Sequence, residues 1–192
     1  MKKRLREIAE IQAGHQFRGR VEADPDGNMP IIQMKDIDAD RRLNAAGLTR
    51  INLDLAPENC RATARDVLFL SRGNRLTAAR VPAAAEGALV SGLFFILRPK
   101  LELIRPDFLA WYINQPSFQV QVQACVRGTG VAILAKSDLQ DLWVLIPPLE
   151  KQGRIMVLDD LFAKERKQFI ELADKRSHLL HALCIQDSDD SF

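Results

Sequence analysis

Apolar residues near the end of the chain recur at alternating spacings of three and four, beginning at Ile155. When that residue opens a heptad, the a and d positions are Ile155, Leu158, Phe162, Glu165, Phe169, Leu172, Arg176, Leu179 and Leu183. Seven of the nine are apolar, and no proline follows Pro148. This repeat is typical of a coiled-coil helix. The pattern predicts one long helix over residues 147–186.

Two charged residues interrupt this apolar seam and indicate how a second helix pairs with it. In a parallel homodimer Glu165 faces Glu165 and Arg176 faces Arg176, which is repulsive. In an antiparallel pair centred between Ile170 and Glu171, Glu165 faces Arg176 of the other chain. Polar pairs in seams set register and direction. The sequence favours an antiparallel homodimer; the alternative is an amphipathic helix packed on its own domain, with both charges reaching solvent. The expected interface residues are Leu158, Phe162, Glu165, Phe169, Leu172, Arg176, Leu179 and Leu183.

Before this helix, short apolar runs alternate with turn-forming residues, which indicates short strands. Strands are expected at residues 30–34, 48–53, 66–71, 88–97 and 142–146. Residues 2–11 fit either a short helix or an edge strand. Residues 106–114 begin with Pro and Asp at helical N-terminal positions, and Lys136–Asp141 predicts a short helix capped by Ser137.

Residues 117–126, SFQVQVQACV, fit two structures. Phe118, Val120 and Val122 alternate with glutamines, as in a half-buried strand. Ser117, however, is a good helix N-cap, and glutamine favours helix. The alternation by itself favours the strand.

The chain is therefore expected to consist of an α+β domain with an antiparallel or mixed sheet, then the long helix, then a disordered acidic tail. Their boundaries are residues 1–146, 147–186 and 187–192. With 47% hydrophobic and 27% charged residues, the composition is that of a soluble protein. Apolar runs such as Val67–Leu70 and 93–97 are too short to cross a membrane, and the basic start lacks the features of a signal peptide. A cytoplasmic location is expected.

No catalytic constellation is visible in the sequence. It has no phosphate-binding loop, dinucleotide-binding glycine motif, nucleophile elbow or HExxH motif. The three cysteines are scattered, without metal-ligand spacing. Asp36, Asp38 and Asp40 alternate within a turn, but no glycine or distal glutamate completes a calcium loop. We expect no catalytic residue, no resident cofactor and no bound metal, which leaves a binding module.

Loops between the predicted strands carry the candidate binding residues. Residues 1–148 are mildly basic, with 20 Lys and Arg against 16 Asp and Glu. Arginine can hold guanine through two hydrogen bonds, asparagine can hold adenine, and Lys and Arg also neutralise phosphates. Arg41 and Arg42 lie in one such loop, and the alternative is that all these groups are solvated surface charges. The expected DNA-binding residues are Arg18, Arg20, Lys35, Arg72, Asn74, Arg75, Arg80, Arg127, Thr129 and Lys136.

The order of segments over residues 5–186 resembles one half of the specificity subunit of type I restriction-modification systems. The segments that carry the resemblance are IAEIQAG, PIIQMKDID, RDVLFLSRGN and RGTGVAILAKSDLQDLWVLIPPLEKQGRI. The last strand, which runs directly into the long helix, is the most telling. The family often has Gly-Asp where this chain has Arg65-Asp66, and Glu-Gln where it has Lys151-Gln152.

The resemblance implies a target recognition domain followed by a helix that packs antiparallel against its counterpart. It also implies a helix at residues 117–126. A full specificity subunit has two recognition domains and two long helices, so a half-subunit is expected to form a homodimer that reads two inverted half-sites in double-stranded DNA. The implied partners are a restriction subunit and modification subunits, which bind S-adenosylmethionine, methylate adenine and dock on the long helices.

A protein of another class also fits these residues. A non-enzymatic scaffold would use the domain and the helix to bind a protein partner, without reading DNA. It would show no salt-dependent affinity for DNA, which distinguishes the two. A piece of a longer subunit with two recognition domains is the alternative to a natural half-subunit, although the start at Met1 and the acidic finish favour a chain that is nearly complete.

Overall fold

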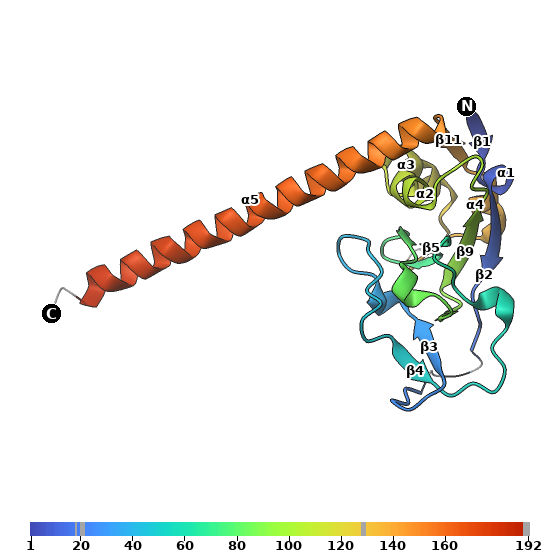
Figure 1. Cartoon of the computed structure of the whole chain (residues 1–192), viewed down its shortest axis with the longest axis horizontal. Coiled ribbons are helices and arrows are strands. Elements are labelled where there is room, and N and C mark those ends of the chain that lie inside the picture. Colours follow the sequence, from blue (N-terminus) through green and yellow to red (C-terminus); the bar gives the residue numbers. More distant parts are fainter. Residues whose placement is uncertain (18, 20–21, 128–129, 190–192) are drawn as a thin grey trace. The chain divides into compact units, whose positions relative to one another are not determined.

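The structure is a computed structural model that describes residues 1–17, 19, 22–127 and 130–189, with side chains up to residue 181. The chain divides into two compact units, Met1–Gln152 and Gly153–Phe192. The first unit contains the strands and the shorter helices (Figure 1). The second contains most of the long helix.

The first unit alternates short strands with short helices. Its strands are β1 (Lys2–Arg4), β2 (Ala9–Ala13), β3 (Met29–Ile32), β4 (Thr49–Ile51), β5 (Val67–Leu70), β6 (Arg72–Gly73), β7 (Ala78–Arg80), β8 (Leu89–Val90), β9 (Phe94–Pro99), β10 (Ala132–Ile133) and β11 (Trp143–Leu145). Its helices are α1 (Leu5–Ile8), α2 (Pro106–Ile113), α3 (Pro116–Cys125) and α4 (Lys136–Asp141), with 3-10 turns η1 (Met34–Asp36), η2 (Glu58–Cys60) and η3 (Ala83–Ala85). The long helix is α5 (Leu149–Asp189). The predicted α+β class with a long C-terminal helix is confirmed.

The main sheet has the order β2-β9-β5-β7, and its neighbouring strands are antiparallel (Figure 1). All of β5 is buried. Leu68 and Leu70 pack with Phe94 in one apolar cluster, and α2 packs against β5 and β7. Both faces of the strand are therefore covered, which explains why residues 66–71 read as a continuous apolar run.

A second sheet, in the order β4-β3-β8, is mixed. β3 pairs antiparallel with β4 and parallel with β8. Met29, Ile31, Ile51 and Leu89 form the apolar cluster on this sheet. Two short antiparallel pairs, β1 with β11 and β6 with β10, join segments that are far apart in sequence. The predicted mixed sheet is confirmed.

The prediction of a single strand over residues 88–97 is wrong. β8 belongs to the second sheet and β9 to the main sheet. Between them the chain turns, and Phe94 N donates to Ser91 O at 3.0 Å. A Cβ at Gly14 would clash with the backbone of Val90 and Ser91, so a second chain segment packs directly on this turn. Because both strands are buried, the apolar run gave no sign of the change of sheet.

Residues 117–126 are helical except for the last, within α3, so the strand indicated by their alternation is wrong and the helix implied by the resemblance is confirmed. Pro116 occupies the first turn, where its missing N–H costs no hydrogen bond. Phe118 and Val122, four residues apart, are fully buried, whereas Val120 is 70% exposed. The buried pair has the spacing of one helix face, and the alternation with glutamine does not follow burial.

Two short segments differ in detail from the expectation. Residues 2–11 contain both proposed structures, since the one-turn α1 lies between β1 and β2, and β2 is an edge strand. The helix α4 is confirmed, but Ser137 does not cap it. Ala135 is the N-cap residue, and the Ser137 hydroxyl lies 3.5 Å from the Asp138 carboxylate.

The helix α5 begins directly after Pro147 and Pro148 and ends at Asp189. It therefore extends into residues 187–192, where the sequence predicts a disordered tail, and residues 190–192 lie outside the described part. Within the described residues, no helix is both long and apolar enough to cross a membrane.

Candidate functional site

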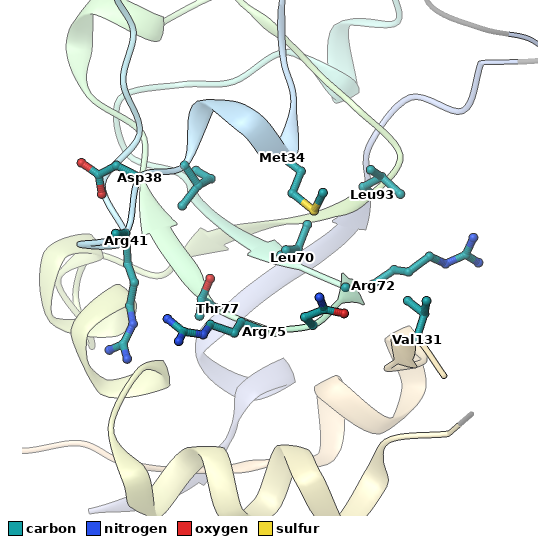
Figure 2. A pocket seen from close by; sticks show the side chains of 13 residues that line it. Met34, Asp38, Arg41, Leu70, Arg72, Arg75, Thr77, Leu93 and Val131 are labelled. Atoms are coloured by element: carbon teal, nitrogen blue, oxygen red, sulfur yellow. The ribbon is translucent and has the colours of Figure 1, made fainter. Parts of the chain in front are cut away.

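A groove of about 570 Å³ lies on the first unit, between the segment after β3 and the loop that joins β5 to β7 (Figure 2). It is lined by Met34, Ile37, Asp38, Ala39, Arg41, Leu70, Arg72, Gly73, Asn74, Arg75, Thr77, Leu93 and Val131. These residues come from four segments of the sequence. The fold therefore brings two of the predicted arginine-bearing loops to one place.

The loop between β5 and β7 is held at both ends. Leu70 N donates to Thr77 O at 2.9 Å, which continues the β5–β7 pairing into the loop. Inside the loop, β6 pairs with β10, with Arg72 opposite Ile133. These backbone contacts fix the positions from which the loop side chains extend.

The exposed rim of the groove is basic. Arg72, Asn74 and Arg75 are exposed, and their side chains have no ion-pair or hydrogen-bond partner among the described residues. Figure 2 shows Arg72 and Arg75 extending in opposite directions from the loop. Arg41, which has a φ of 63°, donates through Nη1 to Asn114 O at 3.3 Å. Three guanidinium groups therefore border one groove, which suits a polyanion.

Arg127 lies next to the same loop. Its backbone forms two hydrogen bonds with Ile133, at 3.0 and 3.2 Å, and Ile133 belongs to β10, which pairs with β6. Its guanidinium is 77% exposed and lies 3.3 Å from the Asp138 carboxylate. Lys136 opens α4 and is exposed. Because a surface ion pair is weak, Arg127 remains available to an incoming phosphate.

Other predicted binding residues lie elsewhere or outside the described part. Lys35 Nζ donates to Thr49 Oγ1 at 2.7 Å and does not line the groove. Arg80, on β7, acts electrostatically on Asp107 and also lies off the groove. The positions outside the described residues are Arg18, Arg20 and Thr129.

The apolar part of the groove was missed by reasoning from the sequence. Met34, Leu93 and Val131 are 48%, 37% and 50% exposed, and Leu70 lies buried among them. In the sequence Met34 and Leu93 belong to apolar runs assigned to strands. Nothing in the pattern separates them from core residues, since only the fold shows that their side chains reach solvent.

The aspartates of the turn after β3 hold the backbone. Asp36 Oδ2 accepts a hydrogen bond from Gln33 N at 2.7 Å, and Asp38 Oδ1 accepts one from Arg42 N at 2.8 Å. Among the described residues, no three His, Cys, Asp or Glu side chains gather as a metal site would require. These carboxylates therefore shape the loop that carries Arg41.

Gln152 lies in the first turn of α5 and is fully buried in the first unit. Its Oε1 accepts a hydrogen bond from Arg105 N at 2.9 Å, and its Nε2 donates to Leu103 O at 3.0 Å and to Pro147 O at 2.8 Å. One amide thus joins the start of α5 to the segment that leads into α2. The sequence alone marked Gln152 only as part of the family resemblance.

Two carboxyl groups of the first unit have shifted pKa values. Burial raises the pKa of Asp66, although Thr63 N donates to it at 2.9 Å and the Arg98 guanidinium lies 3.7 Å away. Burial also acts to raise the pKa of Asp107. There the hydrogen bonds from Arg105, at 2.7 and 3.0 Å, help to outweigh burial, and the pKa falls below its ordinary value of 3.8.

The seam of α5 is exposed within the single chain. Five of its apolar residues are between 46% and 64% exposed: Leu158, Phe162, Phe169, Leu172 and Leu179. Ile155, at the start of the seam, is partly buried. Glu165 and Arg176 are exposed as well. Leu183 belongs to the helix, but its side chain lies outside the described part.

The sequence matches the family model of the type I restriction modification DNA specificity domain over residues 1–172. The chain belongs to this family. As a specificity domain it serves DNA recognition and not catalysis. No protein with a curated description matches the sequence.

Solved structures agree with the fold of this specificity domain. The HsdS subunit from Thermoanaerobacter tengcongensis matches with a TM-score of 0.67 and 22% identity, over 94% of this chain and 46% of that chain. The S subunit of a type I restriction-modification system from M. genitalium matches with a TM-score of 0.57 and 14% identity, over 85% and 39%. A structure described for complex assembly and conformational transition of the type I R-M system matches with a TM-score of 0.63 and 21% identity, over 86% and 38%. The chain spans less than half the length of each.

Proposed function

We propose that this specificity domain reads DNA sequence with the loops around the groove and pairs with a second copy of itself through α5. The observation that carries the readout is the rim of the groove. There Arg72, Asn74 and Arg75 are exposed and lack partners among the described residues, on a chain whose family recognises DNA. Side chains that are not engaged within the protein are available to base edges and phosphates.

The rim residues have complementary recognition chemistry. Arginine binds the O6 and N7 of guanine with two parallel hydrogen bonds, and asparagine binds the N6 and N7 of adenine. Arg127, which is exposed beside the same loop, and Arg41 add positive charge for the phosphates that fix register. The groove therefore combines groups that read bases with groups that position the duplex.

The pairing of two copies follows from the charges in the seam of α5. In an antiparallel pair centred between Ile170 and Glu171, Glu165 of each chain faces Arg176 of the other. Phe162 then meets Leu179, so the exposed apolar side chains of both helices are covered. A seam with opposite charges at symmetric positions favours this direction over the parallel one.

The dimer has two identical DNA-recognition domains related by a two-fold axis. Its target therefore consists of two inverted half-sites separated by a fixed spacer. Half-sites that are read from one face of the duplex lie about one helical turn apart. Modification subunits dock on the paired α5 helices and bind the S-adenosylmethionine, while this chain supplies specificity. A restriction subunit completes the complex, and we expect the protein to work with these partners in the cytoplasm.

The readout is tested by replacing rim arginines and measuring duplex binding by fluorescence anisotropy at several salt concentrations. Arg72→Ala and Arg75→Ala are each expected to weaken binding to the preferred duplex roughly 10- to 100-fold. Arg65→Ala, an exposed arginine away from the groove, is the control and should leave affinity within about twofold. Unchanged affinity in both rim variants would show that the rim of the groove does not bind DNA. A wild-type protein without salt-dependent DNA affinity would instead favour the protein-binding scaffold.

A further inference from the structure

The groove contains an apolar surface that the proposed arginine readout does not use. Met34, Leu93 and Val131 come from three separate segments, and each is more than one third exposed. Leu70 lies buried beside them. Figure 2 shows Met34, Leu70 and Leu93 grouped together, with Arg72 and Val131 on one side and Arg41 on the other. An apolar surface inside a charged rim is suited to a ligand that has an apolar group among polar ones.

Gly73 keeps this surface open. Its φ of 144° is one that residues with a side chain rarely adopt. A Cβ built at this position would lie 3.4 Å from Leu70 Cδ2 and 3.6 Å from Met34 Sδ, so a larger side chain would occupy the space over the apolar surface. The glycine therefore leaves room for an external group against Leu70 and Met34.

The apolar side chains at the centre of the groove favour an apolar group of a base over a phosphate there, because a charged group loses its hydration against an apolar surface. Asp38 also lines the groove, but its Oδ1 accepts a hydrogen bond from Arg42 N, and Figure 2 shows its carboxylate pointing away from Met34 and Leu70. Arg41 and Arg127, which the proposed readout assigns to phosphates, lie at the groove and beside it.

We propose that the apolar surface formed by Met34, Leu70, Leu93 and Val131 recognises the C5-methyl group of a thymine in the major groove of the target. Among the groups on the major-groove edges of the four base pairs, this methyl is the apolar one. The inference rests on the proposed DNA readout and adds a base identity to it. Each half-site contains at least one thymine whose methyl group contributes to affinity.

The test uses the full chain and the duplex that it prefers in selection from a random pool. Each thymine of the half-site is replaced in turn by uracil, which lacks the methyl group and keeps every hydrogen-bonding group. At one position or more, affinity is expected to fall about 4-fold, the factor that corresponds to about 0.8 kcal/mol for one buried methylene-sized group. Other thymine positions should tolerate the change.

Protein variants connect that loss to the groove. In Met34→Ala or Leu93→Ala the ratio of thymine to uracil affinity at the sensitive position is expected to fall toward one, while preferences at other positions persist. Met34 is 48% exposed and Leu93 is 37% exposed, and circular dichroism checks that each variant is folded. Leu55→Ala, which removes an 84% exposed leucine outside the groove, is the matched control and should keep the full ratio.

A preferred site without thymine, or one in which every uracil substitution is neutral, would overturn the methyl readout and leave sequence-specific binding standing. A methyl effect that persists in both Met34→Ala and Leu93→Ala would place the contact elsewhere and overturn the assignment to this surface. Absence of any sequence preference in the wild-type protein would overturn the proposed function, and this inference with it.

Discussion

At the scale of single residues, Gln152 makes the clearest stability prediction. Its buried amide satisfies one backbone N–H and two backbone carbonyls. Gln152→Ala leaves these groups without partners and opens a cavity, so the free energy of unfolding is expected to fall by about 2–4 kcal/mol. Urea denaturation followed by circular dichroism measures this change.

The matched control for Gln152 is Gln123, which is exposed on α3. Gln123→Ala should change the free energy of unfolding by less than about 0.5 kcal/mol. Equal effects of the two substitutions would show that the three hydrogen bonds of Gln152 do not stabilise the fold.

Asp107 makes a prediction about pH. Its folded pKa is lower than its ordinary value of 3.8, so its charged form stabilises the fold above that value, and the contribution is lost as pH falls through the folded pKa. Asp107→Asn should therefore lower the free energy of unfolding at neutral pH, and the difference from wild type should close below pH 3.8. The loss is expected to be about 1 kcal/mol or less, because the side chain of Arg105 is 46% exposed.

Urea titrations of both proteins at a series of pH values test this expectation. A difference in stability that stays constant from neutral to acid pH would contradict it, since an uncharged effect of the substitution has no reason to follow the titration of Asp107.

At the scale of elements, the accuracy of the predicted strands and helices depended on which of their faces are buried. The strand at residues 66–71 was found because a continuous apolar run matches a strand covered on both faces. The same type of run hid the change of sheet at Ser91. In α3 the alternation at Phe118, Val120 and Val122 suggested a strand, although the buried pair Phe118 and Val122 also has helical spacing. Periodicity over ten residues could not distinguish a strand from a helix here, whereas the family resemblance indicated the helix.

The seam of α5 gives an element-scale prediction. Glu165→Arg places like charges opposite each other twice in the antiparallel pair, so the dissociation constant of the dimer is expected to rise by roughly 10-fold or more. Adding Arg176→Glu restores opposite charges and should restore association. Sedimentation equilibrium of the single and double variants measures both effects.

Asp160→Arg is the control for this exchange, because it makes the same change of charge at an exposed position outside the heptad seam. It should leave the dissociation constant within about threefold of wild type. A single Glu165→Arg variant that dimerises as well as the control would rule out the antiparallel register.

At the scale of the whole molecule, the groove could be predicted only in part. Charged loops are visible in a sequence, and two of the predicted loops do meet there, around Arg41 and Arg72–Gly73. The apolar surface depends on Met34, Leu93 and Val131, which come together only through the pairing of the sheets and of β6 with β10. In the sequence Lys35 and Arg80 resemble the rim arginines, but neither lines the groove.

The measurement that tests the central claim most directly is the sequence that the purified chain selects from a random pool of duplexes. A two-fold dimer of the specificity domain predicts two inverted copies of one short sequence, separated by a constant spacer. The centres of the two copies should lie about one helical turn apart. A single uninterrupted site without symmetry would contradict the paired arrangement. A selected pool with no enrichment over the input would contradict DNA readout by this protein.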